Sequence, residues 1–299
     1  MVTRNQPRGL GWLPDVPSVK DYTPTTQEVS KLLQKTAVTS RVRAVSTKGG
    51  ARANAVAAAP ALSPTVDLRA FCSPIENQES LGSCTANAAA GLIEYFEKKA
   101  FGKYTDASRL FIYKATRNLL GQTGDTGAYL RSTMEALVLF GAPPEQYWPY
   151  DIASFDVEPT AFCYAFAANF QAIKYFRLDP SPLTGPEVLD NIKNYLAAGF
   201  PSMFGFPVYE EYMHIPATGQ AAFPAPNSRL YGGHANVAVG YDDNLTINGD
   251  QGALLVRNSW GTSWGVDGYA WLSYRYVTEG LAVDWWSVVE DKWVDTGNF

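Results

Sequence analysis

The spacing of apolar residues along the chain changes character near residue 200. Before that point, apolar residues recur every three or four positions, which is typical of amphipathic helices. Helices are predicted over residues 83–100, 126–140 and 186–198. After that point, apolar stretches are short or alternating and are separated by Gly, Asp and Asn, which indicates strands and turns. Strands are predicted at residues 201–208, 232–243, 252–260 and 268–274. This segregation predicts an α+β protein with two subdomains and a groove between them.

Composition sets the size of the core and removes several classes of partner. The chain has 299 residues, of which 46% are hydrophobic and 13% aromatic, enough for one large or two small domains. A net charge of −5 gives no indication of nucleic-acid binding. No apolar signal-peptide region opens the sequence, and no run of about 18 apolar residues could span a membrane. We expect a soluble monomer, without membrane or nucleic-acid partners, that is cytoplasmic or exported by a non-classical route.

Two segments of unusual composition precede the predicted globular part. Residues 7–24 contain four prolines together with Trp12 and Tyr22, which favours an extended path over a helix. Residues 25–65 carry a net charge of +5, with room for a short helix from Lys31 to Lys35. Residues 40–60 lack aromatic side chains and cannot bury enough surface to fold, so they are interpreted as a linker. This basic linker either lies against the acidic body or is a solvated tether.

Cys84 is one of only three cysteines, and it lies where an irregular stretch gives way to an alanine-rich run. If Gly82 or Ser83 is the helix cap, Cys84 falls in the first helical turn. Unpaired N–H groups and the positive end of the helix dipole favour a thiolate there. We therefore interpret Cys84 as a candidate nucleophile that requires a nearby base.

The chain has only two histidines from which that base can come. His214 lies in a loop-like stretch and is interpreted as a surface residue. His234 begins an alternating strand, and Asn258 follows 24 residues later, flanked by Trp260 and Trp264. An amide can fix the orientation of an imidazole, and a tryptophan can keep water from that hydrogen bond. Two distant histidines make a poor zinc site, so no metal or other cofactor is expected.

These stretches resemble the papain-like cysteine peptidase family, in which Cys, His and Asn occur in that order along the chain. The matching patterns are Gln78 with Cys84 six residues on, Gly82-Ser83-Cys84, His234-Ala235 followed by Val-Gly-Tyr, and Asn258-Ser259-Trp260-Gly261 with Trp264-Gly265. Val66-Asp67-Leu68-Arg69 is similar to the family's mature N-terminus, and Trp148-Pro149-Tyr150 to a stretch midway along. From Cys84 to His234 is 150 residues, and to Asn258 is 174. The resemblance covers residues 66–299.

The resemblance implies a papain-like fold, with the active-site cleft between a helical left subdomain and an antiparallel, β-barrel-like right subdomain. The implied boundaries are 1–62 for a propeptide-like segment and basic linker, 63–170 for the helical subdomain with Gln78 and Cys84, and 171–299 for the β-rich subdomain with His234 and Asn258.

The resemblance also implies a cysteine endopeptidase that acts on peptide or protein substrates. The Cys84 thiolate would attack the carbonyl carbon, and the His234 imidazolium would protonate the leaving amine. Gln78 and the Cys84 backbone N–H would form the oxyanion hole, Asn258 would orient His234, and Trp260 would shield the pair. A thiol-dependent amidase or acyltransferase on the same fold is the alternative. A silent peptide-binding relative would have lost a catalytic residue, and none is missing.

Substrate-binding residues follow from the same resemblance. Residues 124–127 look like the family's glycine strip, although a helix-capping turn with Asp125 or Thr126 explains them equally well. Gly205 is placed on the wall of the main side-chain pocket opposite Ala235, which predicts a roomy, uncharged hole for bulky apolar or aromatic side chains. The residues expected to bind substrate are Gly82, Ser83, Asp125, Thr126, Gly127, Gly205, Gly233, Ala235, Trp260 and Trp264.

The chain also departs from the family pattern. Leu81 and Thr85 stand where the family often has a cysteine and a tryptophan, so the family disulfide anchored at the first position is absent. Cys72 and Cys163 have no family-matched partners. Each is expected to be a buried free thiol, with a bridge between the two as the lesser alternative.

The proline-rich N-terminal stretch has the character of a strand that could fill a cleft. Its prolines make poor scissile partners, and Leu10, Trp12, Leu13 and Tyr22 could anchor it. One interpretation is that residues 1 to about 40 fold back as an intramolecular lid, cleaved or retained. The other is that they form a strap that packs away from the cleft and only adds stability.

Overall fold

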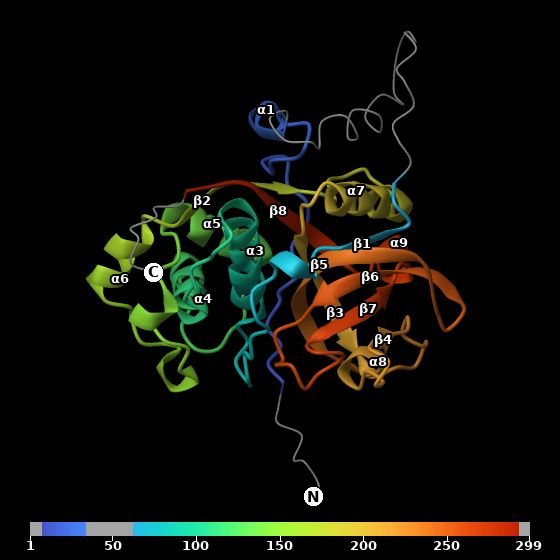
Figure 1. The fold of residues 1–299 in the computed structure, drawn as a ribbon. Helices are drawn as coiled ribbons and strands as arrows, with labels where there is room; N and C mark the ends of the chain where they lie inside the picture. Colours follow the sequence, from blue (N-terminus) through green and yellow to red (C-terminus); the bar gives the residue numbers. More distant parts are fainter. Residues whose placement is uncertain (1–7, 34–61, 293–299) are drawn as a thin grey trace, which may run out of the picture.

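The computed structural model describes residues 8–33 and 62–292 of the chain (Figure 1). The predicted linker over residues 40–60 lies outside these ranges. Among the residues described, no helix is long and apolar enough to cross a membrane.

Helices dominate the part of the chain before residue 170. They are α3 (Cys84–Phe101), α4 (Arg109–Leu119), α5 (Leu130–Leu139) and α6 (Ala161–Ala167), with the short 3-10 turns η1 (Arg69–Phe71), η2 (Glu145–Tyr147) and η3 (Ile152–Ser154). Helix α3 ends at Gly102, whose φ of 73° is the left-handed conformation that glycine adopts without strain. Helix α4 begins after Ser108, whose hydroxyl accepts a hydrogen bond from the backbone N–H of Phe111. Helix α5 begins at Leu130 rather than at residue 126, because its N-cap residue, Tyr129, is still extended.

Strands dominate the second half. They are β2 (Gln171–Arg177), β3 (Ser202–Tyr209), β4 (Gln220–Ala221), β5 (Leu230–Ile247), β6 (Asp250–Arg257), β7 (Tyr269–Ser273) and β8 (Val283–Lys292). Helices α7 (Gly185–Ala197), α8 (Glu210–Met213) and α9 (Arg275–Thr278) lie between them. The strands form one sheet in the order β2-β8-β3-β5-β6-β7-β4, in which only the β4–β7 pair is parallel. The short strand β1 (Thr65–Asp67) pairs with β5.

The predicted α+β class is confirmed by this arrangement. Helices α3 to α6 lie on one side of the molecule and most of the sheet lies on the other (Figure 1). Because β1 pairs with β5, the chain passes along the sheet before it enters the helical half.

Helix α3 is the element that joins the two halves. It packs against β5, and its Ala88, Ala89 and Leu92 belong to one buried cluster with Val237 and Leu255 of the sheet. Small side chains at this contact allow the helix and the strand to approach closely. The N-terminal residue of α3 is therefore held beside the strand that carries His234.

A second buried cluster fills the space between α7 and the sheet, where Trp285 stacks on Phe204 with a centroid distance of 4.2 Å. Helix α1 (Gln27–Leu33) contributes Val29 and Leu33 to this cluster. The short helix predicted from Lys31 to Lys35 therefore begins four residues earlier than expected. The spacing of Val29 and Leu33 puts both on the face that packs against the body, which sets the helix's position.

Candidate active site

Cys84 is the first residue of α3 and is completely buried. The loop before it is fixed by Asp125, whose two carboxylate oxygens accept from the Gly82 N–H at 2.9 and 3.1 Å. The Tyr113 hydroxyl donates to the same carboxylate at 2.6 Å. Ser83 is the N-cap residue, and its hydroxyl lies 2.7 Å from the Tyr150 hydroxyl. These contacts hold the thiol at the helix N-terminus.

The expected lowering of the Cys84 pKa is wrong for this state of the protein. Burial raises the pKa of the thiol to about 12, although backbone groups of Ala235, Gly11, Thr85 and Cys84 itself act to lower it. Cys84 does lie at the helix N-terminus, as expected, but the loss of solvent raises the pKa of its thiol by more than the helix N-terminus lowers it. The thiol is therefore neutral in this structure, and its burial involves a segment of the chain described below.

His234 lies on β5, and its Nε2 is 2.7 Å from the Asn258 Oδ1. The Trp260 ring stacks on the imidazole, with a centroid distance of 4.4 Å and an interplanar angle of 24°. Burial lowers the pKa of His234 to about 4, and hydrogen bonding of the imidazole to the side chains of Asn258 and Asn236 acts in the opposite direction. Nδ1 of His234 is buried and has no geometric hydrogen-bond partner among the described residues.

Gln78 is completely buried, and its amide group is fully used. Its Oε1 accepts from the Ser259 hydroxyl at 2.6 Å, which fixes the orientation of the amide. Its Nε2 donates to the carbonyl oxygens of Leu81 at 2.9 Å and Gly9 at 3.1 Å. The Gly9 carbonyl also accepts from Trp260 Nε1 at 3.1 Å. A carbonyl of the N-terminal segment thus lies between two side-chain donors of the site.

The N-terminal segment passes between the helical half and the sheet (Figure 1). Its backbone N–H groups at Gly11 and Trp12 donate to the Gly233 carbonyl at 3.0 and 3.2 Å. On the other side, the Ala128 N–H donates to the Gly11 carbonyl at 2.8 Å, and the Leu13 N–H donates to the Ala128 carbonyl at 3.0 Å. The segment therefore pairs with both walls of the space above Cys84. We call residues 8–13 the arm.

The Trp12 side chain fills a pocket beside the arm and is 6% exposed. Gly205 and Gly233 line this pocket, and a Cβ atom at either position would overlap Trp12. At the end of the pocket, Trp12 Nε1 donates to Asp284 Oδ2 at 3.1 Å. The expectation of an uncharged pocket is wrong, because Asp284 was not among the residues assigned to its walls.

Asp284 is itself fully buried and held by several partners. Trp286 Nε1 donates to its Oδ1 at 2.7 Å, and the Arg177 guanidinium lies 3.3 Å from the same oxygen. Burial raises the pKa of Asp284 to about 6, although Arg177 and the indole N–H donors lower it. The pocket therefore ends in a carboxylate whose two oxygens both accept hydrogen bonds.

The other predicted substrate-binding residues separate into two groups. Gly82 and Gly127 both lie against Gly11. A Cβ atom on Gly11 would overlap the Gly82 backbone, and a Cβ atom on Gly127 would overlap the Gly11 backbone. Ser83 and Asp125 instead contact other parts of the body, as described above. Thr126 donates to the Gln122 side chain, and Trp264 packs edge-on against Trp260 at 5.4 Å. His214 is exposed beside Glu210 and Tyr231, outside this assembly.

Three contributors to the site were not predicted from the sequence. Ala128 pairs with the arm on both sides of Trp12, Ser259 orients Gln78, and Asp284 closes the Trp12 pocket. Ala128 directly follows the glycine stretch, and Ser259 directly follows Asn258. Their positions beside predicted site residues could have indicated that they contribute to the site. Asp284 offered none, because it lies 272 residues from Trp12. Cys72, Cys84 and Cys163 are all buried free thiols, so the alternative bridge between Cys72 and Cys163 is not formed.

Comparisons with known proteins agree with this arrangement. The family described as papain family cysteine protease matches residues 62–283. An uncharacterised peptidase C1-like protein of Acanthamoeba polyphaga mimivirus is 37% identical over 220 residues, which cover 72% of this chain and 69% of the viral protein.

Solved structures give the same result for the fold. Xylellain, a cysteine protease from Xylella fastidiosa, is 30% identical with a TM-score of 0.71, over 98% of this chain and 99% of xylellain. A digestive procathepsin L 3 of Tenebrio molitor larval midgut is 18% identical with a TM-score of 0.60, over 93% of this chain and 83% of its own, and is similar in fold. With the family match and the viral relative, these likenesses establish that the chain belongs to the papain family of cysteine proteases.

Proposed function

We propose that this peptidase is a cysteine endopeptidase in which Cys84 and His234 form the catalytic pair and the arm restricts access to them. The observation that carries the proposal is the 2.7 Å contact between His234 Nε2 and Asn258 Oδ1. If Nε2 carries the proton donated to Asn258, then Nδ1 is the basic nitrogen. Among the described residues, no group lies within normal hydrogen-bond distance and angle of that nitrogen, so it is available to a thiol.

The reaction follows from these roles. His234 Nδ1 accepts the thiol proton, and the Cys84 sulfur attacks the carbonyl carbon of the scissile bond. Negative charge develops on the carbonyl oxygen, where Gln78 Nε2 and the Cys84 backbone N–H donate to it. The imidazolium then gives its proton to the leaving amine, and an acyl-enzyme remains. His234 next takes a proton from water, the resulting hydroxide displaces the sulfur, and the thiol is restored.

The positions of the supporting side chains favour this assignment. Ser259 holds the Gln78 amide with its N–H groups directed away from Ser259, so one donor is free for a substrate oxygen when Gly9 is absent. The stacked Trp260 ring covers one face of His234 and limits water access to the bond with Asn258. Such partners orient a catalytic imidazole without adding charge.

The arm restricts the cleft in two ways under this proposal. The Gly9 carbonyl takes the donors of Gln78 and Trp260, so it stands where a substrate carbonyl would bind. Covering the pair also disfavours its charged form, since burial raises the pKa of Cys84 and lowers that of His234. Departure of the arm returns both groups to water and frees the donors.

The Trp12 pocket is the substrate pocket that we assign to the residue one position before the scissile one. Its glycine walls at Gly205 and Gly233 leave room for a large ring. Asp284 adds an acceptor for an N–H at the far end. We expect bulky aromatic side chains to be preferred, and tryptophan above phenylalanine, because only the indole can donate to Asp284.

Selective alkylation tests the assignment of the nucleophile. In a Trp12→Ala variant, in which the arm is weakened, iodoacetamide at mildly acidic pH should modify Cys84 well before Cys72 or Cys163. All three thiols are buried in the native chain, so exposure alone does not predict this order. Equal labelling of the three thiols, or full peptidase activity in a Cys84→Ala variant, would rule out the assignment.

A further inference from the structure

The N-terminal segment continues beyond the arm and has a second, separate attachment to the body. Residues 21–33 run along β2 and end in α1, which lies at the top of the molecule and contacts β2 and β8 (Figure 1). The Arg177 N–H donates to the Tyr22 carbonyl at 2.7 Å. The Lys174 ammonium lies 4.9 Å from the centre of the Tyr22 ring. We call residues 21–33 the anchor.

The anchor is part of the hydrophobic core. Val29 is fully buried and Leu33 is 4% exposed. Both belong to the cluster that includes Phe176, Tyr195, Leu196 and Trp285. Asp21 adds ion pairs to Arg131 at 3.2 Å and to Arg177 at 3.6 Å. The contacts of Val29 and Leu33 lie outside the cleft, so the anchor stays bound whether or not the arm occupies the site.

Residues 14–20 connect the arm to the anchor and are much less packed. Val16 is 76% exposed and Val19 is fully exposed. The chain turns here, with the Asp21 N–H donating to the Ser18 carbonyl at 3.0 Å. Arg131 contacts the start of this stretch. Its guanidinium forms an ion pair with Asp15 at 3.0 Å and donates to the Val16 carbonyl at 2.8 Å. We call residues 14–20 the hinge.

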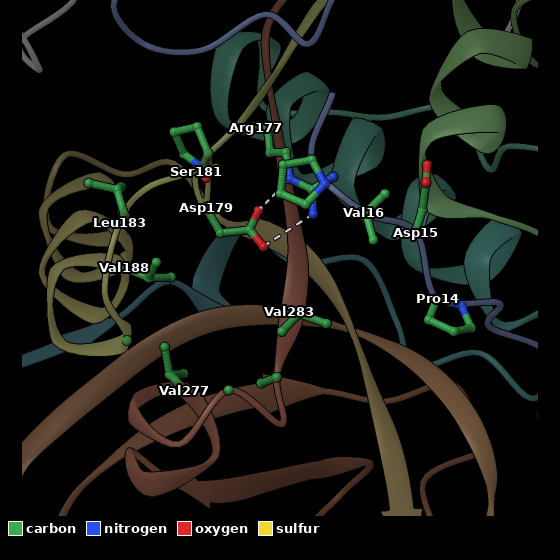
Figure 2. Close-up of a pocket in the computed structure, with 15 residues that line it drawn as sticks. Pro14, Asp15, Val16, Arg177, Asp179, Ser181, Leu183, Val188, Val277 and Val283 are labelled. Atoms are coloured by element: carbon green, nitrogen blue, oxygen red, sulfur yellow. Dashed lines mark hydrogen bonds and ion pairs between the residues drawn. The ribbon is translucent and has the colours of Figure 1, made fainter. Parts of the chain in front are cut away.

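The first part of the hinge borders an open cavity and is not packed against a continuous surface. Residues 14–17 form one wall of an open cavity of about 610 Å³. In Figure 2, Val16 lies on one side of this cavity, Leu183 and Val188 lie on the opposite side, and Val277 and Val283 lie below them. Exposed turns with few packing contacts are the preferred sites of proteolytic cleavage.

We propose that the exposed turn from Val16 to Lys20 is the activating cleavage site of this peptidase, and that the anchor is a permanent part of its folded body. This inference rests on the proposed restriction of the cleft by the arm. It adds that cleavage anywhere in residues 34–61 does not activate the protein, since the arm stays joined to the anchor.

The cleavage is carried out in trans by another endopeptidase. Water is added across one peptide bond of the turn, which leaves a new carboxylate on the arm fragment and a new amine on the anchor. The turn cannot enter its own cleft, because the arm and the anchor are fixed on either side of it. Once cut, the arm fragment loses the high effective concentration that its tether provides, and it dissociates.

Two full-length variants test the inference. One carries the recognition sequence of a sequence-specific protease between Val19 and Lys20, and the other carries the same sequence within residues 34–61. After cleavage and gel filtration, the retained fragments are identified by mass spectrometry, and hydrolysis of a fluorogenic peptide is measured. The hinge-cut protein should lose its arm and gain at least tenfold in activity. The linker-cut protein should retain its N-terminal fragment and stay within twofold of the uncut protein.

A substitution in the anchor provides the matched control. In the linker-cut protein, Val29→Asp should release the fragment and raise activity, whereas Glu28→Ala, at the exposed neighbouring position of α1, should change neither. Full activation and fragment loss on linker cleavage alone would overturn the inference while leaving restriction by the arm intact. Equal activity of the uncut and hinge-cut proteins, with the arm fragment lost, would overturn the restriction itself.

Discussion

Trp12→Ala in the full-length chain should open the cleft without unfolding the protein. Trp12 is the largest side chain of the arm. Its ring fills the pocket lined by Gly205 and Gly233, and its Nε1 donates to Asp284. The pocket lies open to solvent once the arm leaves. The substitution therefore weakens docking of the arm and does not create a cavity in the core of the body.

The magnitude follows from what the side chain loses. Removing a buried tryptophan down to alanine typically costs about 3–5 kcal/mol, which includes the lost burial of its ring. At about 1.4 kcal/mol for each factor of ten, docking of the arm should weaken by roughly 100- to 4000-fold. Trp12→Phe keeps most of the ring but loses the bond to Asp284, so a smaller effect, on the order of tenfold, is expected.

The assay is the rate at which iodoacetamide alkylates Cys84, measured by mass spectrometry under conditions in which the arm closes faster than the reagent reacts. The rate then follows the fraction of open molecules, so Trp12→Ala should label at least 100-fold faster than the native chain, up to the rate of an arm-free protein. Val19→Ala serves as control, because Val19 is fully exposed on the same segment. A folded Trp12→Ala protein that labels as slowly as the native chain would refute the reasoning.

Three further predictions concern the site itself. With the arm removed, His234→Ala should abolish peptide hydrolysis, Asn258→Ala should lower it by about 10- to 100-fold through lost orientation, and His214→Ala should stay within twofold. A more damaging effect at His214 would contradict the assignment. Burial lowers the pKa of His234 to about 4 in the folded chain, so its neutral form contributes stability above about pH 6.5 that is lost as the pH falls toward 4. Denaturant titrations should therefore show that the difference in unfolding free energy between the native chain and His234→Gln shrinks by about 3 kcal/mol from pH 7 to pH 4. A difference that stays constant with pH would be inconsistent with a neutral buried imidazole. Asp284→Asn should lower kcat/KM for a substrate with tryptophan in the pocket about fivefold relative to phenylalanine, since about 1 kcal/mol of charge assistance is lost, and an unchanged ratio would remove Asp284 from selectivity.

The local parts of the fold could be predicted because they depend on neighbours along the chain. The spacing of Ala88, Leu92 and Phe96 and the glycine at position 102 fixed the extent of α3 to within a residue or two. The start of α1 was missed, because its position depends on where Val29 and Leu33 meet the body. Propensity alone carries no information about that contact.

The site shows a similar division. The order of Cys84, His234 and Asn258 along the chain was sufficient to expect that they act together. The protonation state of Cys84 could not be predicted in this way, because it depends on whether the arm covers the thiol. Asp284 was missed because its side chain meets Trp12 from the opposite end of the sequence, 272 residues away.

The central claim is that this chain is a cysteine peptidase whose own arm closes the cleft above Cys84. The most direct test compares fluorogenic peptide hydrolysis by three proteins, which are the full chain, a chain beginning at residue 19, and the same shortened chain with Cys84→Ala. The shortened chain keeps residues 21–33, including the buried Val29 and Leu33, so we expect it to fold like the full chain. We predict at least tenfold higher activity in the shortened chain than in the full chain, and none in the Cys84→Ala protein. Equal activity of the full and shortened chains, or activity that survives Cys84→Ala, would contradict the claim.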